Sequence, residues 1–287
     1  MRYPATELVL DGNGAVYHLG LLPQQLADKV ILVGDQDRVG KISRFFDEIE
    51  HRVQHREFVS HTGWYQQKRI TVLSTGIGTD NIDICMQELD ALVNIDLVNR
   101  SDKPENKSLE LVRIGTCGIL QPDIPVHSWI LSTHALGLDN VAHFYPIDFS
   151  QEEQHLLVCI NEQVQFPKNI IPYLSAANPE LVARFNSEKV NTGITVTSSG
   201  FYGPQGRSLR MESKMRHIHL ALGAFLSNEQ KIMNFEMESS AIFALGKALG
   251  HKCTTLCLGV ANRPLEEFST GIDKEMDALI KYVLDRI

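Results

Sequence analysis

Two carboxylates flank a methionine in the segment Glu236-Met237-Glu238, directly before two serines and an apolar run that ends near Gly250. Carboxylates at this spacing can accept hydrogen bonds from the hydroxyls of a sugar. Acidic and hydroxyl side chains are also typical of a helix N-terminus, where free backbone N–H groups need acceptors. An isolated pair would therefore be interpreted as a helix cap. Three arginines elsewhere in the chain favour the chemical interpretation, because they could hold an anion beside a sugar bound by the two acids.

The segment Gly34-Asp35-Gln36-Asp37-Arg38 follows a predicted buried strand. Glycine lets backbone N–H groups approach an anion closely, and Arg38 can bring a forked cation to the same place. A tight turn with an exposed arginine is the alternative for this segment taken alone.

Arg113 lies within the apolar run 111–114 and is followed by Gly115 and Thr116. An arginine in an apolar strand costs several kcal/mol unless it is paired, so Arg113 must have a dedicated partner. That partner is either a structural carboxylate or a bound phosphate, with the Thr116 hydroxyl as a second donor. Arg56 is a weaker third candidate. Ligands of open α/β sheets collect at the carboxyl ends of strands, where Gly34 and Thr116 are predicted to lie, and this shared placement favours phosphate.

Other site chemistries lack their motifs. The chain has no Walker A sequence, no G-x-G-x-x-G after a strand and no G-x-S-x-G elbow. His51 and His55 have metal-ligand spacing, and so does the pair His217 and His219, but neither pair has an obvious third ligand beside it. The prediction is that the protein holds no metal and no cofactor.

These residues need an alternating scaffold of strands and helices, which indicates an α/β layered fold. Strands are predicted at 30–33, 70–73, 111–114, 190–198 and 253–261, the third one closed by residues 115–118. Thr79 or Asp80 should cap the helix that follows the second strand. The last predicted helix has one apolar stripe, formed by Met276, Leu279, Ile280, Val283, Leu284 and Ile287. The polar segment 99–107 is predicted to be a solvated loop, and residues 1–287 are predicted to form one domain.

Composition limits the functions of the chain. Its 287 residues are 43% apolar and carry a formal net charge of −8 with no basic tract, so binding to nucleic acid or anionic membranes is not expected. Four of its five cysteines lie in apolar surroundings, which favours reduced thiols in a cytoplasmic protein. No apolar run reaches membrane-spanning length.

Five motifs in order along residues 16–263 resemble the nucleoside phosphorylase family, and within it most of all the uridine phosphorylases. They are Gly34-Asp35-x-Asp37-Arg38, Ser74-Thr75-Gly76-Ile77-Gly78, Arg113-Ile114-Gly115-Thr116-x-Gly118, Phe201-Tyr202-x-x-Gln205-x-Arg207 and Glu236-Met237-Glu238-Ser239. The resemblance implies a single-domain three-layer α/β/α fold whose central mixed sheet is partly barrel-like. It also implies a homo-oligomer, with a dimer as the minimal unit and a hexamer, a trimer of dimers, as the expected assembly.

The resemblance implies the reversible phosphorolysis of uridine to uracil and ribose 1-phosphate, and it assigns roles to residues. Phosphate would be held by Gly34, Arg38, Arg56, Arg113 and Thr116. Ribose would be held by His18, Glu236, Met237 and Glu238, with His18 and Arg56 reaching in from a neighbouring subunit. The nucleobase would contact Cys117, Gly118, Phe201, Gln205, Arg207 and Arg263. Arg113, Arg207 and Glu238 would carry the catalysis.

The chain also departs from the family pattern. Purine-cleaving relatives place an aspartate where this chain has Gly200, so a pyrimidine substrate is favoured over a purine or a broader range. Some uridine phosphorylases bind an inter-subunit potassium ion through a serine where this chain has Asn81, which weakens the expectation of that ion despite Glu57. Two alternatives are a hydrolytic nucleosidase, which lacks the arginine set in this family, and a non-catalytic nucleoside-binding protein.

Overall fold

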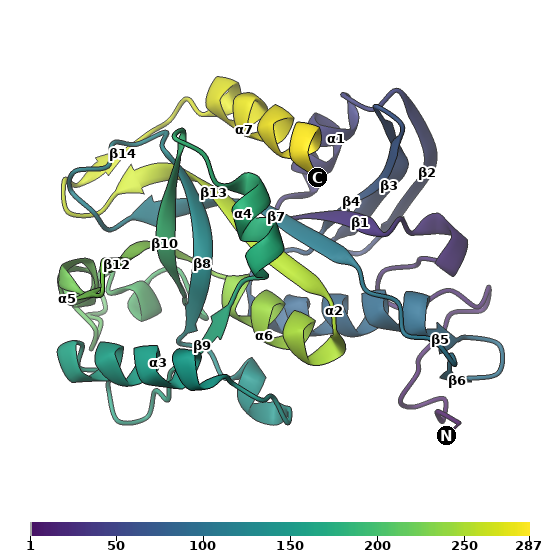
Figure 1. Ribbon diagram of the computed structural model, residues 1–287, viewed down its shortest axis with the longest axis horizontal. Helices are drawn as coiled ribbons and strands as arrows, with labels where there is room; N and C mark the ends of the chain where they lie inside the picture. Colours follow the sequence, from purple (N-terminus) through teal and green to yellow (C-terminus); the bar gives the residue numbers. More distant parts are fainter. Residues whose placement is uncertain (1) are drawn as a thin grey trace.

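The computed structural model describes residues 2–287, which form one large mixed sheet between two layers of helices (Figure 1). The strands of this sheet are β1 Lys29–Val33, β2 Glu48–His55, β3 Phe58–Tyr65, β4 Lys68–Ser74, β7 Glu110–Ile119, β8 Trp129–Gly137, β9 Tyr173–Ala176, β10 Val190–Thr197, β11 Leu226–Ser227, β12 Gln230–Glu236, β13 Lys252–Asn262 and β14 Glu267–Phe268. The helices are α1 Gln36–Ser43, α2 Thr79–Asn94, α3 Gln151–Gln163, α4 Pro179–Phe185, α5 Ile218–Ala224, α6 Ser239–Leu249 and α7 Asp273–Arg286.

Five strands of the sheet close on themselves. The sheet order is β11-β12-β10-β8-β13-β7-β1-β4-β3-β2, and β12 also pairs with β7, so that β12, β10, β8, β13 and β7 form a ring. The predicted α/β fold with a partly barrel-like mixed sheet is therefore confirmed. Parallel pairs dominate the centre, where β1 lies between β4 and β7.

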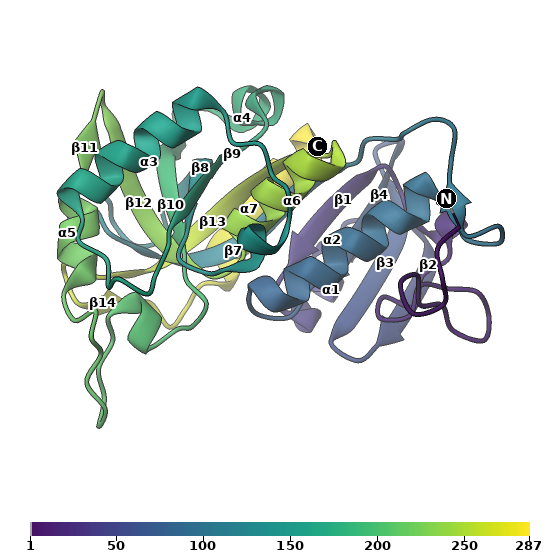
Figure 2. The same ribbon diagram turned by 90° about the horizontal axis from the view of Figure 1, so that it is seen from below.

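The alternation of side chains along the strands explains the two helical layers. In β1, Val30 and Leu32 pack against α2 and α6, while Ile31 and Val33 pack against α1 and α7 on the other face. Figure 2 shows α2 and α6 lying together across the first face, and these two helices are in contact. A third apolar cluster fills the space between the ring and helices α3 and α5.

Most predicted elements are present. The strands expected at 30–33, 70–73, 190–198 and 253–261 are β1, β4, β10 and β13, and the predicted apolar stripe of the last helix is buried along α7. The segment 99–107 contains only the two-residue strand β6 (Ser101–Asp102), which pairs with β5 (Ile95–Asp96). Among residues 2–287, no helix is both long and apolar enough to cross a bilayer.

Two local predictions are wrong. The third strand does not close at Gly115, because β7 continues to Ile119 and pairs with β13 on one side and with β12 at its end. Helix α2 is not capped by Thr79 or Asp80. Its N-cap is Gly78, whose N–H donates to a carboxylate oxygen of Glu238 at 2.9 Å. A long-range partner takes the role that a local side chain would otherwise have.

Candidate active site

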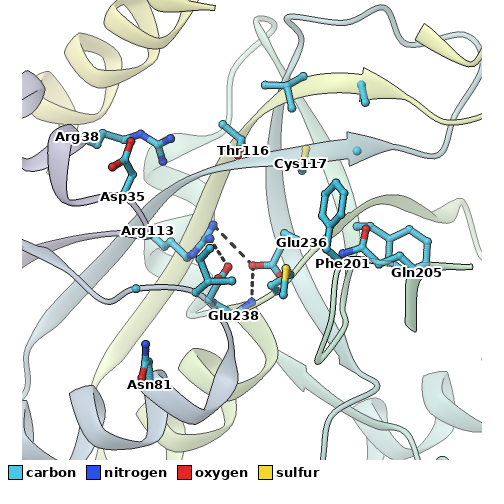
Figure 3. A pocket seen from close by; sticks show the side chains of 18 of the residues that line it. Asp35, Arg38, Asn81, Arg113, Thr116, Cys117, Phe201, Gln205, Glu236 and Glu238 are labelled. Carbon is cyan, nitrogen blue, oxygen red and sulfur yellow. Dashed lines mark hydrogen bonds and ion pairs between the residues drawn. The ribbon is translucent and has the colours of Figure 1, made fainter. Parts of the chain in front are cut away.

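A cavity of about 800 Å³ opens where the ends of several strands meet the starts of α1 and α6 (Figure 3). Loops after β1 and β4 form one wall, the middle of β7 forms the back, and the segment after β10 forms the far end. Twelve of the fifteen predicted site residues line it, namely Gly34, Arg38, Arg113, Thr116, Cys117, Gly118, Phe201, Gln205, Arg207, Glu236, Met237 and Glu238.

Helix α1 presents the first arginine to this cavity. Asp35 caps the helix by accepting a hydrogen bond from the backbone N–H of Asp37 at 3.0 Å. Arg38, in the first turn, donates through Nη1 to the carbonyl oxygen of Ile114 on β7 at 3.2 Å. Burial, together with the nearby charge of Arg113, lowers the pKa of Arg38. A guanidinium whose pKa is lowered by a second cation nearby favours a bound anion beside it.

Arg113 lies in the middle of β7, not at a strand end, and its guanidinium is buried against both acids of the Glu236-Met237-Glu238 segment. It donates to Oε2 of Glu238, and its Nη1 lies 3.7 Å from Oε2 of Glu236. Although burial opposes its charge, these carboxylates raise the pKa of Arg113. The dedicated partner expected for a buried arginine is thus a carboxylate in this structure, while the Nε atom of Arg113 has no partner among residues 2–287.

Glu236 ends β12 and accepts hydrogen bonds from the start of α6. The backbone N–H groups of Glu238 and Ser239 donate to its Oε2 at 3.0 and 2.9 Å, and the Ser239 hydroxyl donates to the same atom at 2.9 Å. The hydroxyl of Thr197, at the end of β10, donates to Oε1. The helix-cap interpretation therefore applies to Glu236, and the same bonds hold its carboxylate at the cavity wall.

Glu238 joins three parts of the site. Its Oε1 accepts from Gly78 after β4, and its Oε2 accepts from Arg113 on β7. Burial raises the pKa of Glu238, with Arg113 opposing this shift and Glu236 adding to it. An ionised carboxylate in such a place depends on the neighbouring cation.

The far end of the cavity combines an aromatic ring with amide and guanidinium groups. The guanidinium of Arg207 lies over the ring of Phe201, 3.8 Å from its centroid, and donates to the backbone carbonyl oxygen of Phe201 and to the side-chain oxygen Oε1 of Gln205. Burial and the neighbouring Arg263 lower the pKa of Arg207 to about 10. Cys117 and Gly118 complete this end, and burial raises the pKa of the Cys117 thiol. A flat polar ligand finds a stacking surface and N–H donors here.

Three predicted residues lie outside this cavity. Arg263 donates from Nη1 to the carbonyl oxygen of Gln205 at 3.2 Å and lines a smaller neighbouring cavity of about 320 Å³ together with Arg207. His18 and Arg56 lie near each other on the surface of the chain, joined by Tyr17. The Tyr17 ring centroid is 5.1 Å from that of His18 and 5.5 Å from the guanidinium carbon of Arg56. The ring of His18 also contacts Glu88, with 2.6 Å between Nδ1 and Oε1.

The cavity also contains residues to which the sequence interpretation gave no role. Val260 and Ala261 lie near the end of β13, and both belong to the strand predicted at 253–261. The place of Phe268 (β14) at the cavity could not be predicted, because a single aromatic residue in a polar segment indicates no particular role. Neither histidine pair, His51 with His55 or His217 with His219, belongs to a group of three metal-ligating side chains among residues 2–287.

Comparison with known proteins gives a consistent result. The family model described as "Phosphorylase superfamily" matches residues 28–285. A uridine phosphorylase of Thermococcus kodakarensis is 28% identical over 280 residues, which are 96% of this chain and 87% of that protein. A uridine phosphorylase of Haemophilus influenzae is 30% identical over 257 residues, which are 88% of each chain.

A solved structure has the same architecture over almost its whole length. It is a nucleoside phosphorylase of Trypanosoma brucei described as showing uridine phosphorylase activity. The two chains superimpose with a TM-score of 0.88 and 29% identity, covering 98% of this chain and 99% of the other.

Proposed function

The chain belongs to the phosphorylase superfamily, and on that premise we propose that it is a uridine phosphorylase, converting uridine and inorganic phosphate to uracil and ribose 1-phosphate. The observation that carries the proposal is the convergence of two arginines, two carboxylates and a Phe-Gln-Arg group on one cavity. Each group matches one part of the substrates, in the order phosphate, ribose and base.

Phosphate belongs at the end formed by Gly34, Arg38 and Thr116, within reach of Arg113. Because Arg113 is engaged with Glu238 in the free enzyme, phosphate competes with a carboxylate for this guanidinium. When phosphate also accepts hydrogen bonds from Arg113, the Glu238 carboxylate becomes a better acceptor for the ribose hydroxyls. Binding of the anion thus prepares the sugar site.

The reaction exchanges one bond at C1′ for another. A phosphate oxygen forms a bond to C1′ as the bond from C1′ to the base nitrogen breaks, and the electron pair of that bond leaves with uracil. Positive charge on the ribose ring is balanced by the phosphate below it. Negative charge spreads over the carbonyl groups of the departing base, where Arg207 and Gln205 donate hydrogen bonds, and uracil then takes up a proton. No step requires a metal, a cofactor or a covalent enzyme intermediate.

Two residues supply the argument for a shared site. Arg56 and His18 lie outside the cavity of their own chain and next to each other on its surface. We propose that both act in the cavity of a neighbouring subunit, Arg56 on phosphate and His18 on the ribose 5′-hydroxyl, in a homodimer or a hexamer built from dimers. The buried thiols of Cys85, Cys117, Cys253 and Cys257 suit a reducing compartment, and we place the enzyme in cytoplasmic pyrimidine salvage.

Gly200 supports a pyrimidine substrate. It precedes Phe201 at the base end, and glycine cannot protonate a purine ring nitrogen. We therefore expect uridine to be cleaved faster than guanosine or inosine, with thymidine and deoxyuridine included in the same panel to measure tolerance at the 2′ position.

The test is uracil release from uridine with and without phosphate. Uracil should appear only when phosphate is present. Equal rates in both assays would identify a hydrolase, and uridine binding without uracil release at high enzyme concentration would identify a binding protein.

A further inference from the structure

Asp139 is a buried carboxylate behind the site to which the reaction assigns no role. It follows β8 and is 6% exposed. Its Oδ1 accepts from the backbone N–H of Val141 at 2.9 Å, both oxygens lie 2.9 Å from the hydroxyl of Tyr173, and Oδ2 accepts from the hydroxyl of Ser240 at 2.7 Å. All three donors are uncharged. A buried carboxylate held without a cation among its donors costs several kcal/mol, so its presence needs an explanation beyond packing.

The hydrogen-bond directions lead from Asp139 to the cavity. An ionised carboxylate can only accept, so the Ser240 hydroxyl must donate to Asp139. The backbone N–H of Ser240 donates to the Thr197 hydroxyl oxygen at 2.9 Å. Since Thr197 accepts there, its own proton is directed to Oε1 of Glu236. Ser240 therefore donates toward both carboxylates, through its hydroxyl to Asp139 and through its backbone N–H to Thr197, which donates in turn to Glu236.

The first turn of α6 lies between the two carboxylates. Ser239 donates twice to Glu236, and the next residue, Ser240, donates to Asp139. Thr197, Ser239 and Ser240 are fully buried, so water cannot replace any of these bonds. A change in the position of Ser240 must therefore change the hydrogen bonds that orient the Glu236 carboxylate.

The backbone at Gly137 leaves space for the Tyr173 ring. Gly137, at the end of β8, pairs with Tyr173 on β9, and a Cβ atom at Gly137 would collide with the Tyr173 ring. The ring also packs edge-on against His143, with centroids 5.6 Å apart. These contacts fix the Tyr173 ring where its hydroxyl lies 3.0 Å from the Ser240 hydroxyl and 2.9 Å from both Asp139 oxygens.

We propose that Asp139 is a positioning residue for nucleoside cleavage: together with Tyr173 it fixes Ser240, and through Ser240 and Thr197 it orients the Glu236 carboxylate toward the ribose. This inference rests on the proposed function, because it takes Glu236 as a ribose-binding group. It assigns no contact between Asp139 and substrate.

The test separates the two substrates. Asp139→Asn and Ser240→Ala should each lower kcat/KM for uridine about tenfold, while KM for phosphate stays within about twofold of the wild-type value. Thr197→Val should behave like them, and Thr197→Ser, which keeps the hydroxyl, should restore most of the loss. Because Asp139 acts through Ser240, the double variant Asp139→Asn/Ser240→Ala should be little worse than either single variant.

A matched control distinguishes positioning from general loss of stability. Glu153 is also a buried carboxylate and binds Lys247 in the last turns of α6. Glu153→Gln should lower the melting temperature while leaving kcat/KM for uridine unchanged. If Asp139→Asn does not fold, Tyr173→Phe, which keeps the ring and removes one donor, takes its place and should show a smaller decrease in kcat/KM for uridine.

The outcomes are distinct. An active wild type whose Asp139→Asn and Tyr173→Phe variants keep the wild-type kcat/KM for uridine would overturn this inference alone, as would strictly additive losses in the double variant. A wild type that releases no uracil from uridine and phosphate would overturn the proposed function together with it.

Discussion

Glu238 is the residue in which the electrostatics of the site converge. Burial and the charge of Glu236 raise the pKa of its carboxyl above the ordinary value of 4.5, and Arg113 limits this shift. The ionised form is therefore less favourable in the folded protein than in the unfolded chain, so its ionisation reduces stability as pH rises from 4.5 through the folded pKa. In the proposed reaction this cost is offset when the ionised carboxylate accepts hydrogen bonds from the ribose hydroxyls.

A pH profile tests this assignment. A raised pKa leaves more Glu238 protonated at a given acidic pH, so the acid limb of kcat/KM should lie above pH 4.5. Glu236→Gln removes one cause of the shift, and the acid limb of that variant should move to lower pH although its overall rate is reduced. Phosphate ionises identically in both assays, so a difference between the acid limbs of the wild type and of Glu236→Gln arises from the protein. A limb that stays in place or moves to higher pH in Glu236→Gln would contradict the assignment.

Gln205 provides a test of the base end. It is 3% exposed and accepts a hydrogen bond from Arg207, so its side chain is held in one orientation beside Phe201. Gln205→Ala should lower kcat/KM for uridine, by an amount that corresponds to a loss of about 1–3 kcal/mol of transition-state stabilisation. The KM for phosphate should stay close to the wild-type value. Steady-state kinetics with each substrate varied in turn measure both values. An equal loss of phosphate affinity would show that Gln205 supports the whole cavity and does not read the base.

The placement of Gly34 and Thr116 after predicted strands indicated one end of the cavity, and the family resemblance supplied most of the other residues that line it. The ion pair between Arg113 and Glu238 could not be predicted, since 125 residues separate the two and only the closed ring brings β7 and β12 together. The cap of α2 was missed for the same reason. Gly78 offers its N–H to Glu238, a partner that no local pattern contains.

At the scale of elements, β7 differs most from expectation. Gly115-Thr116-Cys117-Gly118 has the composition of a turn, but the ring supplies hydrogen-bond partners on both sides and keeps these residues extended. The reason for glycine at position 115 is steric. A Cβ atom there would collide with Nη1 of Arg113 and would lie 2.9 Å from the Sγ of Cys257. The absence of a side chain at Gly115 thus leaves room for the Arg113 guanidinium beside β7.

Gly115→Ala should therefore displace the Arg113 guanidinium. We expect kcat/KM to fall by at least about tenfold, because the added methyl group costs about 1–3 kcal/mol of overpacking at the charged contact. Gly40→Ala in α1 is the control, since its Cβ meets no atom within 4 Å and should raise stability slightly without changing the rate. Steady-state kinetics and thermal unfolding of both variants measure these effects. Wild-type rates in Gly115→Ala would show that Arg113 need not occupy its observed position.

At the scale of the whole molecule, the arrangement of Arg56 and His18 predicts sites shared between subunits. Arg56→Ala and Arg113→Ala should each be nearly inactive. Mixed in equal amounts by refolding, they should recover about a quarter of wild-type activity, because half of the dimers are mixed and each contains one intact site. Arg38→Ala mixed with Arg113→Ala should recover nothing, since both residues serve the cavity of their own chain. Failure of the first pair to recover at any ratio would show that the sites are not shared.

The central claim is that phosphate, held by the arginines of this cavity, attacks the ribose. Phosphorus NMR of the products of uridine cleavage tests it most directly, with uracil measured in the same samples. The wild-type enzyme should form ribose 1-phosphate in equal amount to uracil, and Arg113→Ala should lose both products together. Uracil accompanied by free ribose, or an unchanged yield of ribose 1-phosphate from Arg113→Ala, would contradict the claim.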